Sequence, residues 1–158
     1  MPSRSKAVDG AFSSTCAIIR SLGVLSDTWT FLLLREALLG RRTYAEFEQN
    51  LGIGTAVLAD RLAHLVDCGV MEKLPYRIPG QRVRHAYSLT PAGNELRIVL
   101  AALHQWGAEH LASSTPLARL PLDRVTHRRL RVALIDDQGQ TVDSQAMEFF
   151  PESFATPD

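Results

Sequence analysis

The chain has 158 residues and a net charge of zero from 17 basic and 17 acidic residues, a length that suits one main domain with at most a small appendage. All basic residues lie before residue 132 and outnumber the acids there by about six, so the neutral total does not exclude a nucleic-acid partner. No stretch approaches the ~20 apolar residues of a membrane span, and the start lacks the apolar core of a signal peptide. Two distant cysteines without a CxxC pattern argue against a disulfide scaffold or a zinc site and favour a reducing cytoplasm.

The N-terminal part is expected to begin with a mobile tail, residues 1–11, followed by two helices. The first helix is predicted over about Ser14–Leu25. The second starts at Asp27 and Thr28 and runs over Trp29–Leu39, with its apolar side turned to the core.

A helix-turn-helix is predicted from Thr43 onward. The Thr43 hydroxyl and the Glu46 carboxylate have the spacing of a capping box, which fixes a helix start. Asn50–Gly54 contains two glycines that allow a tight turn, and a second helix begins at about Thr55. In the DNA-binding form of this unit the second helix enters the major groove, although helical hairpins also occur as plain structure.

The segment after this helix is expected to form a β-hairpin with a basic tip. Gly69 has the position of a glycine that ends a helix. Val70–Arg77 has extended character, with a proline that suits an edge strand, and Val83–Leu89 returns after a Pro-Gly loop. Such a ribbon after a helix-turn-helix is the winged-helix arrangement, and it contacts phosphates or the minor groove. The alternative is a solvated hairpin whose arginines only maintain solubility.

The residues expected to contact DNA lie at the helix-turn-helix start, on the outer side of its second helix and around the hairpin tip. They are Thr43, Thr55, Ala56, Val57, Asp60, Arg61, His64, Arg77, Arg82, Arg84 and His85. Arg61 has a second interpretation, because it could pair with Asp60, Glu46 or another acid instead. His64 is expected at the surface, facing the phosphate backbone rather than binding a metal.

A long helix is predicted after the hairpin, from the N-cap Thr90 and the first-turn Pro91 to about Ala112. Apolar residues recur along it at three- and four-residue steps, so it needs a partner or folds back on its own domain. Residues 113–158 are expected to form an extension. It would contain a linker and a β-hairpin between Leu130–Ile135 and Thr141–Met147, and it would end in mobile residues from Pro151.

Several pieces of the chain resemble the HxlR-type winged-helix transcriptional regulators of bacteria. They are Cys16, Leu22–Trp29, Leu32–Glu36, Gly40–Phe47, Gly52-Ile53, Leu58–Leu62, Tyr87–Gly93 and Trp106-Gly107. The resemblance covers roughly residues 12–112. It implies a mainly α winged helix-turn-helix domain and a homodimer that binds an inverted-repeat operator at the nucleoid, in the cytoplasm. One departure is Ala56, where the family often has a basic or polar residue, so specificity would rest on neighbouring side chains, thymine methyls and water.

The resemblance also implies that the first and the long helix pack across a two-fold axis in a dimer. The residues expected at that interface are Ile18, Ile19, Leu22, Leu96, Val99, Leu100, Leu103 and Trp106. Cys16 is expected near a helix N-terminus, where thiolate is favoured. In some similar regulators a cysteine at this place responds to oxidants or electrophiles, and the alternative is a small buried residue at the interface. Cys68 is predicted to be a core residue.

No nucleophile elbow, P-loop or HExxH pattern is present, so neither an enzyme nor a cofactor or metal site is predicted. The main hypothesis is a regulator that binds double-stranded DNA and responds to a small molecule, or to a redox or electrophile signal. The alternative is a winged-helix protein-interaction module without sequence-specific DNA binding. The arginine-rich hairpin favours the first, since an interaction module does not need a basic tip.

Overall fold

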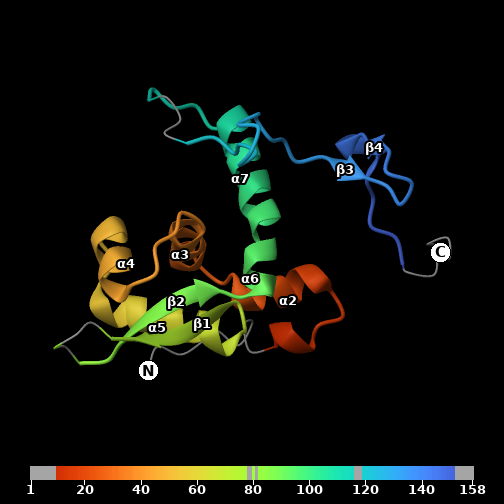
Figure 1. Cartoon of the computed structure of the whole chain (residues 1–158). Helices are drawn as coiled ribbons and strands as arrows, with labels where there is room; N and C mark the ends of the chain where they lie inside the picture. The colour runs from red at the N-terminus through yellow and green to blue at the C-terminus, as the bar shows by residue number, and fades with distance from the viewer. Residues whose placement is uncertain (1–9, 78–79, 81, 116–118, 152–158) are drawn as a thin grey trace. The chain divides into compact units, whose positions relative to one another are not determined.

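The computed structural model describes residues 10–77, 80, 82–115 and 119–151. Residues 1–9 of the predicted N-terminal tail and 152–158 at the other end lie outside the described residues, as do parts of the predicted Pro-Gly loop and linker. Two compact units divide between Leu100 and Ala101 (Figure 1), and each is described by itself. The domain boundary expected at residue 112 stays a prediction.

The first unit contains the predicted helix-turn-helix and hairpin. Its elements, of which the last continues into the second unit, are η1 (Ala11–Ser13), α2 (Ala17–Val24), α3 (Thr28–Leu38), α4 (Tyr44–Leu51), α5 (Thr55–Asp67), β1 (Met71–Tyr76), β2 (Arg84–Leu89), α6 (Pro91–Glu95) and α7 (Arg97–His110). The predicted mainly helical winged-helix fold is thus confirmed. No single helix in the described ranges is long and apolar enough to cross a membrane; α2 and α3 reach that length and composition only together, with a 79° bend.

Two predicted helices differ in their limits. The first begins at Ala17 rather than Ser14, because Cys16 is still extended and takes the N-cap position. The long helix after the hairpin is interrupted at Leu96, which separates α6 from α7. Just before that break the Asn94 amide donates hydrogen bonds to the main-chain oxygens of Leu89 and Thr90, at 3.3 and 3.0 Å. No proline or glycine marks this interruption in the sequence.

Side-chain caps start the helices where the sequence predicts. Thr43 Oγ1 accepts from the Glu46 N–H at 3.3 Å, while Glu46 Oε2 accepts from the Thr43 N–H at 2.8 Å, so the capping box is complete. Gly52 ends α4 with a φ of 60°, a left-handed conformation that glycine adopts without strain. Thr90 Oγ1 accepts from the Gly93 N–H at 3.1 Å and starts α6.

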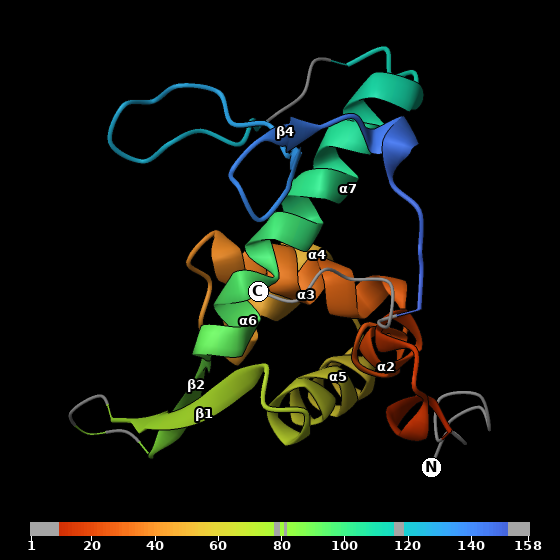
Figure 2. The same ribbon diagram turned by 90° about the vertical axis from the view of Figure 1, so that its right-hand side faces the viewer.

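The core of the first unit lies between α3, α4, α5 and the hairpin. Figure 2 shows α3 above α5, with the two strands extending away from them. The buried apolar side chains are Leu25, Leu33, Leu34, Phe47, Ile53, Leu58, Leu62, Leu65, Val70 and Met71. Burial of one such large side chain contributes about 1.5–3 kcal/mol, so these residues dominate the stability of the winged helix.

The hairpin is antiparallel, with Met71 opposite Leu89 and Tyr76 opposite Arg84. A third segment adds to its outer edge, because the Tyr87 N–H donates to Arg42 O at 2.7 Å and Thr43 bridges to Ala86. The start of the helix-turn-helix is therefore joined to the hairpin by main-chain hydrogen bonds.

Gly93 sets how closely α6 approaches the hairpin. A Cβ atom at this position would lie 2.1 Å from the main-chain oxygen of Val70, closer than any side chain allows. Two hydrogen bonds hold the same junction: the Thr90 hydroxyl donates to Gly69 O at 2.7 Å, and the Thr90 N–H donates to Val70 O at 3.1 Å. Glycine is therefore required at position 93 by close packing rather than by its backbone angles.

The second unit contains most of α7 and the C-terminal extension. Its hairpin pairs β3 (Leu134–Ile135) with β4 (Thr141–Val142) and is followed by η2 (Ser144–Ala146). The predicted C-terminal hairpin is confirmed, with strands shorter than expected. The extension is held to α7 by a hydrogen bond from the Val132 N–H to Gln105 Oε1 at 3.0 Å and by a salt bridge of 3.1 Å between Arg131 and Glu109.

Candidate nucleic-acid interface

A tyrosine hydroxyl links the two helices of the helix-turn-helix. The Tyr44 hydroxyl, at the start of α4, donates a hydrogen bond to the main-chain oxygen of Thr55, the first residue of α5. Burial, and secondarily the charge of Glu48, raise the pKa of Tyr44 above its usual value, so the hydroxyl keeps the proton that it donates. The N-terminal end of α5 is therefore presented in a defined position.

The outer side of α5 is accessible as expected. Thr55, Ala56, Val57 and Asp60 are exposed, and 40% of the Val57 surface remains accessible. The opposite side of α5 is fully buried in the core. The exposed residues offer a hydroxyl, two apolar side chains and one carboxylate, which is a surface for base edges and thymine methyls rather than for phosphates.

Arg61 forms ion pairs with two acidic residues of its own domain. Its guanidinium contacts Asp60 and lies 2.5 Å from an oxygen of Asp27, the N-cap residue of α3. The Arg61 side chain is 28% exposed and Asp27 is 26% exposed. Of the two interpretations of Arg61, ion pairing is therefore the one found. Asp60 was a partner named from the sequence, and Asp27 is the other acid of the domain that the sequence left unnamed.

The prediction that His64 lies at the surface is wrong. His64 is 8% exposed, and its Nε2 lies 3.2 Å from the main-chain oxygen of Val24 at the end of α2. The Cys68 sulfur lies 3.7 Å from His64 Nδ1 and packs against the core, as predicted for Cys68. His64 lies beside the buried Leu65 on α5. Its ring therefore turns toward the interior, where it meets the main-chain oxygen of Val24.

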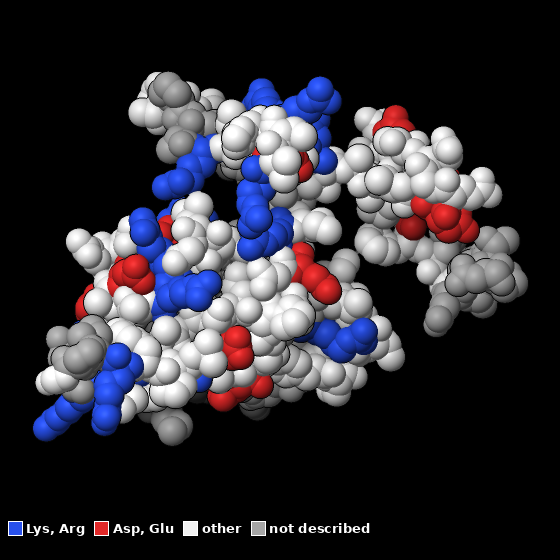
Figure 3. Space-filling model, viewed as in Figure 1, with Lys and Arg blue, Asp and Glu red and all other residues white. Residues whose placement is uncertain are grey.

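The hairpin presents the basic residues at its tip. Arg77, Arg82, Arg84 and His85 are all exposed, and Arg84 faces Tyr76 at the last strand pair. Basic side chains gather at the tip of this hairpin, at the lower left of Figure 3. Long cations at the end of a ribbon can follow phosphates without a fixed partner in the free protein.

Thr43 has a structural role in addition to its predicted contact with DNA. Its hydroxyl donates to Glu46 Oε2 at 2.9 Å within the capping box. Main-chain N–H groups of Arg42 and Thr43, followed by the Thr43 hydroxyl, lower the pKa of Glu46 below its usual value. The start of α4 is therefore charged and well ordered at neutral pH.

Apolar side chains remain exposed on the two helices predicted to dimerise. Ile18, Ile19 and Leu22 are exposed on α2, with 54% of Leu22 accessible. On α7 the exposed side chains include Val99, Leu103 and Trp106. Leu96 and Leu100, which were expected at the interface, pack instead against the core of their own unit. Those two positions thus follow the fold-back alternative.

Cys16 lies at the N-terminus of α2, as expected, where it takes the N-cap position itself, and its side chain is exposed. Its main-chain N–H is bonded to Ser14 Oγ at 3.1 Å, while the sulfur forms no capping hydrogen bond. Its role in sensing stays a prediction. The alternative, a small residue buried at the dimer interface, stays a prediction as well.

This geometry agrees with the comparison to known families. The model of the HxlR-like helix-turn-helix family matches residues 24–115, more than half of the chain. The chain belongs to this family. It is 40% identical over 92 residues to the uncharacterized HTH-type transcriptional regulator Rv3095 of Mycobacterium tuberculosis. That match covers 58% of this chain and only 57% of Rv3095, a little over half of its length.

Two solved structures resemble the HxlR-like chain over more of its length. PA1607, described as a proposed transcription factor, is 26% identical with a TM-score of 0.79, and the match covers 90% of this chain and 99% of that one. PA1374 from Pseudomonas aeruginosa, described in the same way, is 31% identical with a TM-score of 0.62, and the match covers 89% and 95%. The family model ends at residue 115, so these two matches extend into the C-terminal extension.

Proposed function

We propose that this HxlR-like protein binds double-stranded DNA at an inverted-repeat operator and regulates transcription as a homodimer. The single observation that carries the proposal is the exposed N-terminal half of α5, held in place by the Tyr44 hydroxyl, beside a hairpin with a basic tip. In this arrangement α5 enters the major groove and the hairpin lies along the flanking phosphates. The named relatives, which are HTH-type transcriptional regulators, support this assignment.

The homodimer is supported by the unpartnered apolar surface on α2 and α7. Ile18, Ile19, Leu22, Val99, Leu103 and Trp106 are exposed in the single chain. Exposed apolar patches of this kind mark interaction surfaces, and two-fold symmetry gives the inverted repeat that two copies of α5 require. Leu96 and Leu100 contribute less, because they are already packed.

Cys16 is our candidate for a redox or electrophile sensor. It is exposed, it is the N-cap residue of α2, and it adjoins the proposed dimer surface. Covalent modification there adds bulk beside that surface and alters the spacing of the two recognition helices. Treatment with diamide or methylglyoxal should release DNA from the wild type but not from Cys16→Ser. Equal release from both proteins would make Cys16 structural.

A gel shift with the fragment upstream of the protein's own gene tests the main proposal. A specific, competitor-resistant complex is expected, with a stoichiometry of two chains per site. If the protein is instead a protein-interaction module, it should bind the fragment only weakly, and unrelated competitor DNA should remove it from the complex. The exposed arginines at the hairpin tip favour DNA over that alternative.

A further inference from the structure

A small pocket in the first unit is separate from the proposed DNA-binding surface. It has a volume of about 190 Å³ and lies between the end of α3, the end of β2 and the α6–α7 junction. Among the residues that the structure describes, none of α5 or of the hairpin tip lines it. Since a water molecule occupies about 30 Å³ in the liquid, the space equals that of about six water molecules and suits only a small ligand.

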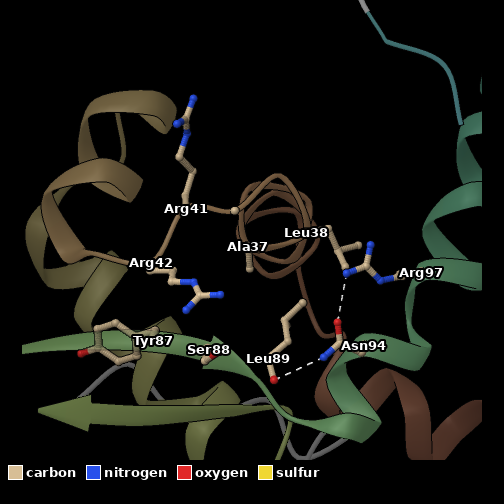
Figure 4. Close-up of a pocket in the computed structure, with 10 residues that line it drawn as sticks. Ala37, Leu38, Arg41, Arg42, Tyr87, Ser88, Leu89, Asn94 and Arg97 are labelled. Atoms are coloured by element: carbon tan, nitrogen blue, oxygen red, sulfur yellow. Dashed lines mark hydrogen bonds between the residues drawn. The ribbon is translucent and has the colours of Figure 1, made fainter. Parts of the chain in front are cut away.

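Two arginines enter this pocket from opposite walls. Figure 4 shows the Arg42 and Arg97 side chains directed toward the space above Ser88 and Leu89, while the Arg41 side chain points away. None of the described residues that line the pocket is acidic. Two cations that share a pocket with no lining acid repel each other, and an anion between them removes that repulsion.

The two guanidinium groups differ in how they are held. Arg97 donates to Asn94 Oδ1 at 3.1 Å, and Asn94 is itself fixed by its bonds to Leu89 O and Thr90 O. The Arg42 guanidinium has no hydrogen bond or salt bridge to any residue that the structure describes. One arginine is thus preorganised and the other is free to close on a ligand, which is a usual division in an anion site.

The remaining walls combine polar groups with a few apolar side chains. Ala37 and Leu38 from α3 and Leu89 from β2 line the pocket beside the arginines, and Ser88 adds one hydroxyl donor. A bare inorganic ion would leave the apolar walls without a contact. A short carbon skeleton with two negative charges matches both the walls and the cations.

From this geometry we infer that the pocket binds a small organic dianion, a dicarboxylate or a phosphate monoester, between Arg42 and Arg97. The ligand connects two parts of the winged helix. Arg42 precedes the cap of α4, and its main-chain oxygen accepts from Tyr87, whereas Arg97 is the first residue of α7. The role of the anion rests on the proposed function: it is an effector that changes the position of α7 relative to the helix-turn-helix and so changes operator affinity.

Calorimetry on the free full-length chain tests the site without DNA. The probes are succinate as the dicarboxylate, glycerol 3-phosphate as the phosphate monoester, and acetate as a monoanion control. At least one dianion is expected to bind once per chain, and more tightly than acetate. Arg42→Gln and Arg97→Gln should each weaken it by about tenfold or more, because each removes a charge-assisted hydrogen-bonding group.

Arg41→Gln is the matched control, since it removes the same charge from a neighbouring side chain. Arg41 also lines the pocket, but its side chain points away from the space that Arg42 and Arg97 share, and its Nε lies 4.0 Å from Glu36. The affinity of Arg41→Gln should stay within about twofold of the wild type. Ser88→Val narrows the pocket while keeping both arginines, and it should also weaken binding. Thermal unfolding checks that each variant folds, and the Ser88 variant serves if an arginine variant does not.

Three results would overturn the site: no dianion binds at millimolar concentration, Arg41→Gln is as harmful as Arg42→Gln, or an unrelated DNA duplex displaces the probe as well as the operator does. The last result would make Arg42 and Arg97 phosphate contacts of DNA. The effector role is measured separately, by titrating the bound probe into an operator complex. An unchanged operator affinity overturns that role alone, and a chain that binds no operator leaves the calorimetric result standing.

Discussion

The exposed side of α5 and the tip of the hairpin differ sharply in charge. The outer residues of α5 are Thr55, Ala56, Val57 and Asp60, and the cation beside them, Arg61, is paired with acids of its own domain. The hairpin tip carries three exposed arginines and a histidine. Cations supply affinity for any duplex, whereas base-edge contacts supply discrimination between sequences. We therefore expect the two tasks to be divided between the hairpin and α5.

The largest effect on operator affinity is expected when the proposed dimer is broken, because the second α5 and the second hairpin are then lost. Val99→Glu combined with Leu103→Glu should give monomers, because two charges would be buried in the proposed apolar interface. Loss of one half-site should lower operator affinity by about a hundredfold or more. Sedimentation and fluorescence anisotropy measure the two effects. Leu39→Glu, a similar exposed position at the end of α3, is the control, and a dimeric double variant would contradict the assigned surface.

The hairpin should account for the salt dependence. Arg82→Ala with Arg84→Ala is expected to weaken binding to operator and unrelated DNA alike. It should reduce the slope of log affinity against log salt by about 0.9 for each lost phosphate contact. Arg128→Ala, an exposed arginine in the C-terminal extension, is the control. An unchanged slope in the double variant would mean that the hairpin does not touch the backbone.

A substitution of Val57 tests how much α5 contributes to discrimination between DNA sequences. Val57→Ala should weaken operator binding by about five- to tenfold through lost apolar contact with bases, at an unchanged salt slope. Binding to unrelated DNA serves as the internal control and should not change. Equal losses on both kinds of DNA would remove the distinction between α5 and the hairpin.

Arg61 should affect folding more than DNA. Arg61→Met removes the contacts to Asp27 and Asp60 and should lower the free energy of unfolding by about 1 kcal/mol, while the salt slope stays the same. A double-mutant cycle with Asp27→Asn isolates the pair, since asparagine still caps α3. A smaller salt slope in Arg61→Met would return this residue to the DNA-binding surface.

The smallest effect concerns the capping box. Main-chain N–H groups lower the pKa of the Glu46 carboxyl, so its stabilisation is present above the usual value of 4.5 and is lost as pH falls through the lowered one. Glu46→Gln should cost less than about 1 kcal/mol at neutral pH, because glutamine keeps part of the box. The difference from wild type should vanish in acid. Chemical denaturation across pH measures it, with Glu72→Gln as an exposed control.

Local signals in the sequence were sufficient for the winged helix. Thr43 with Glu46, Gly69, and Thr90 with Pro91 mark helix ends through contacts within a few residues, and each lies where predicted. The exposed side of α5 also follows from helical periodicity alone. Such features depend on spacing along one segment, which a sequence states directly.

Features that depend on two distant segments were not predictable in this way. His64 turns inward to the Val24 carbonyl, and Arg61 finds Asp27 on another helix. The pocket joins Arg42 to Arg97, which no spacing rule connects. Leu100 repeats with the apolar side of α7 but is partly buried against the core of its own unit, because periodicity shows which face is apolar and not which surface covers it.

The absence of room at Gly93 has a mechanical consequence. With the backbone of α6 in direct contact with Val70 and the Thr90 hydroxyl bonded to Gly69, the hairpin has no hinge where its second strand ends. The hairpin and α6 should therefore move together as one rigid body. The amide hydrogens at their junction should exchange with solvent only when the whole winged helix opens. A displacement of α6 should then also displace the arginines at the tip of the hairpin.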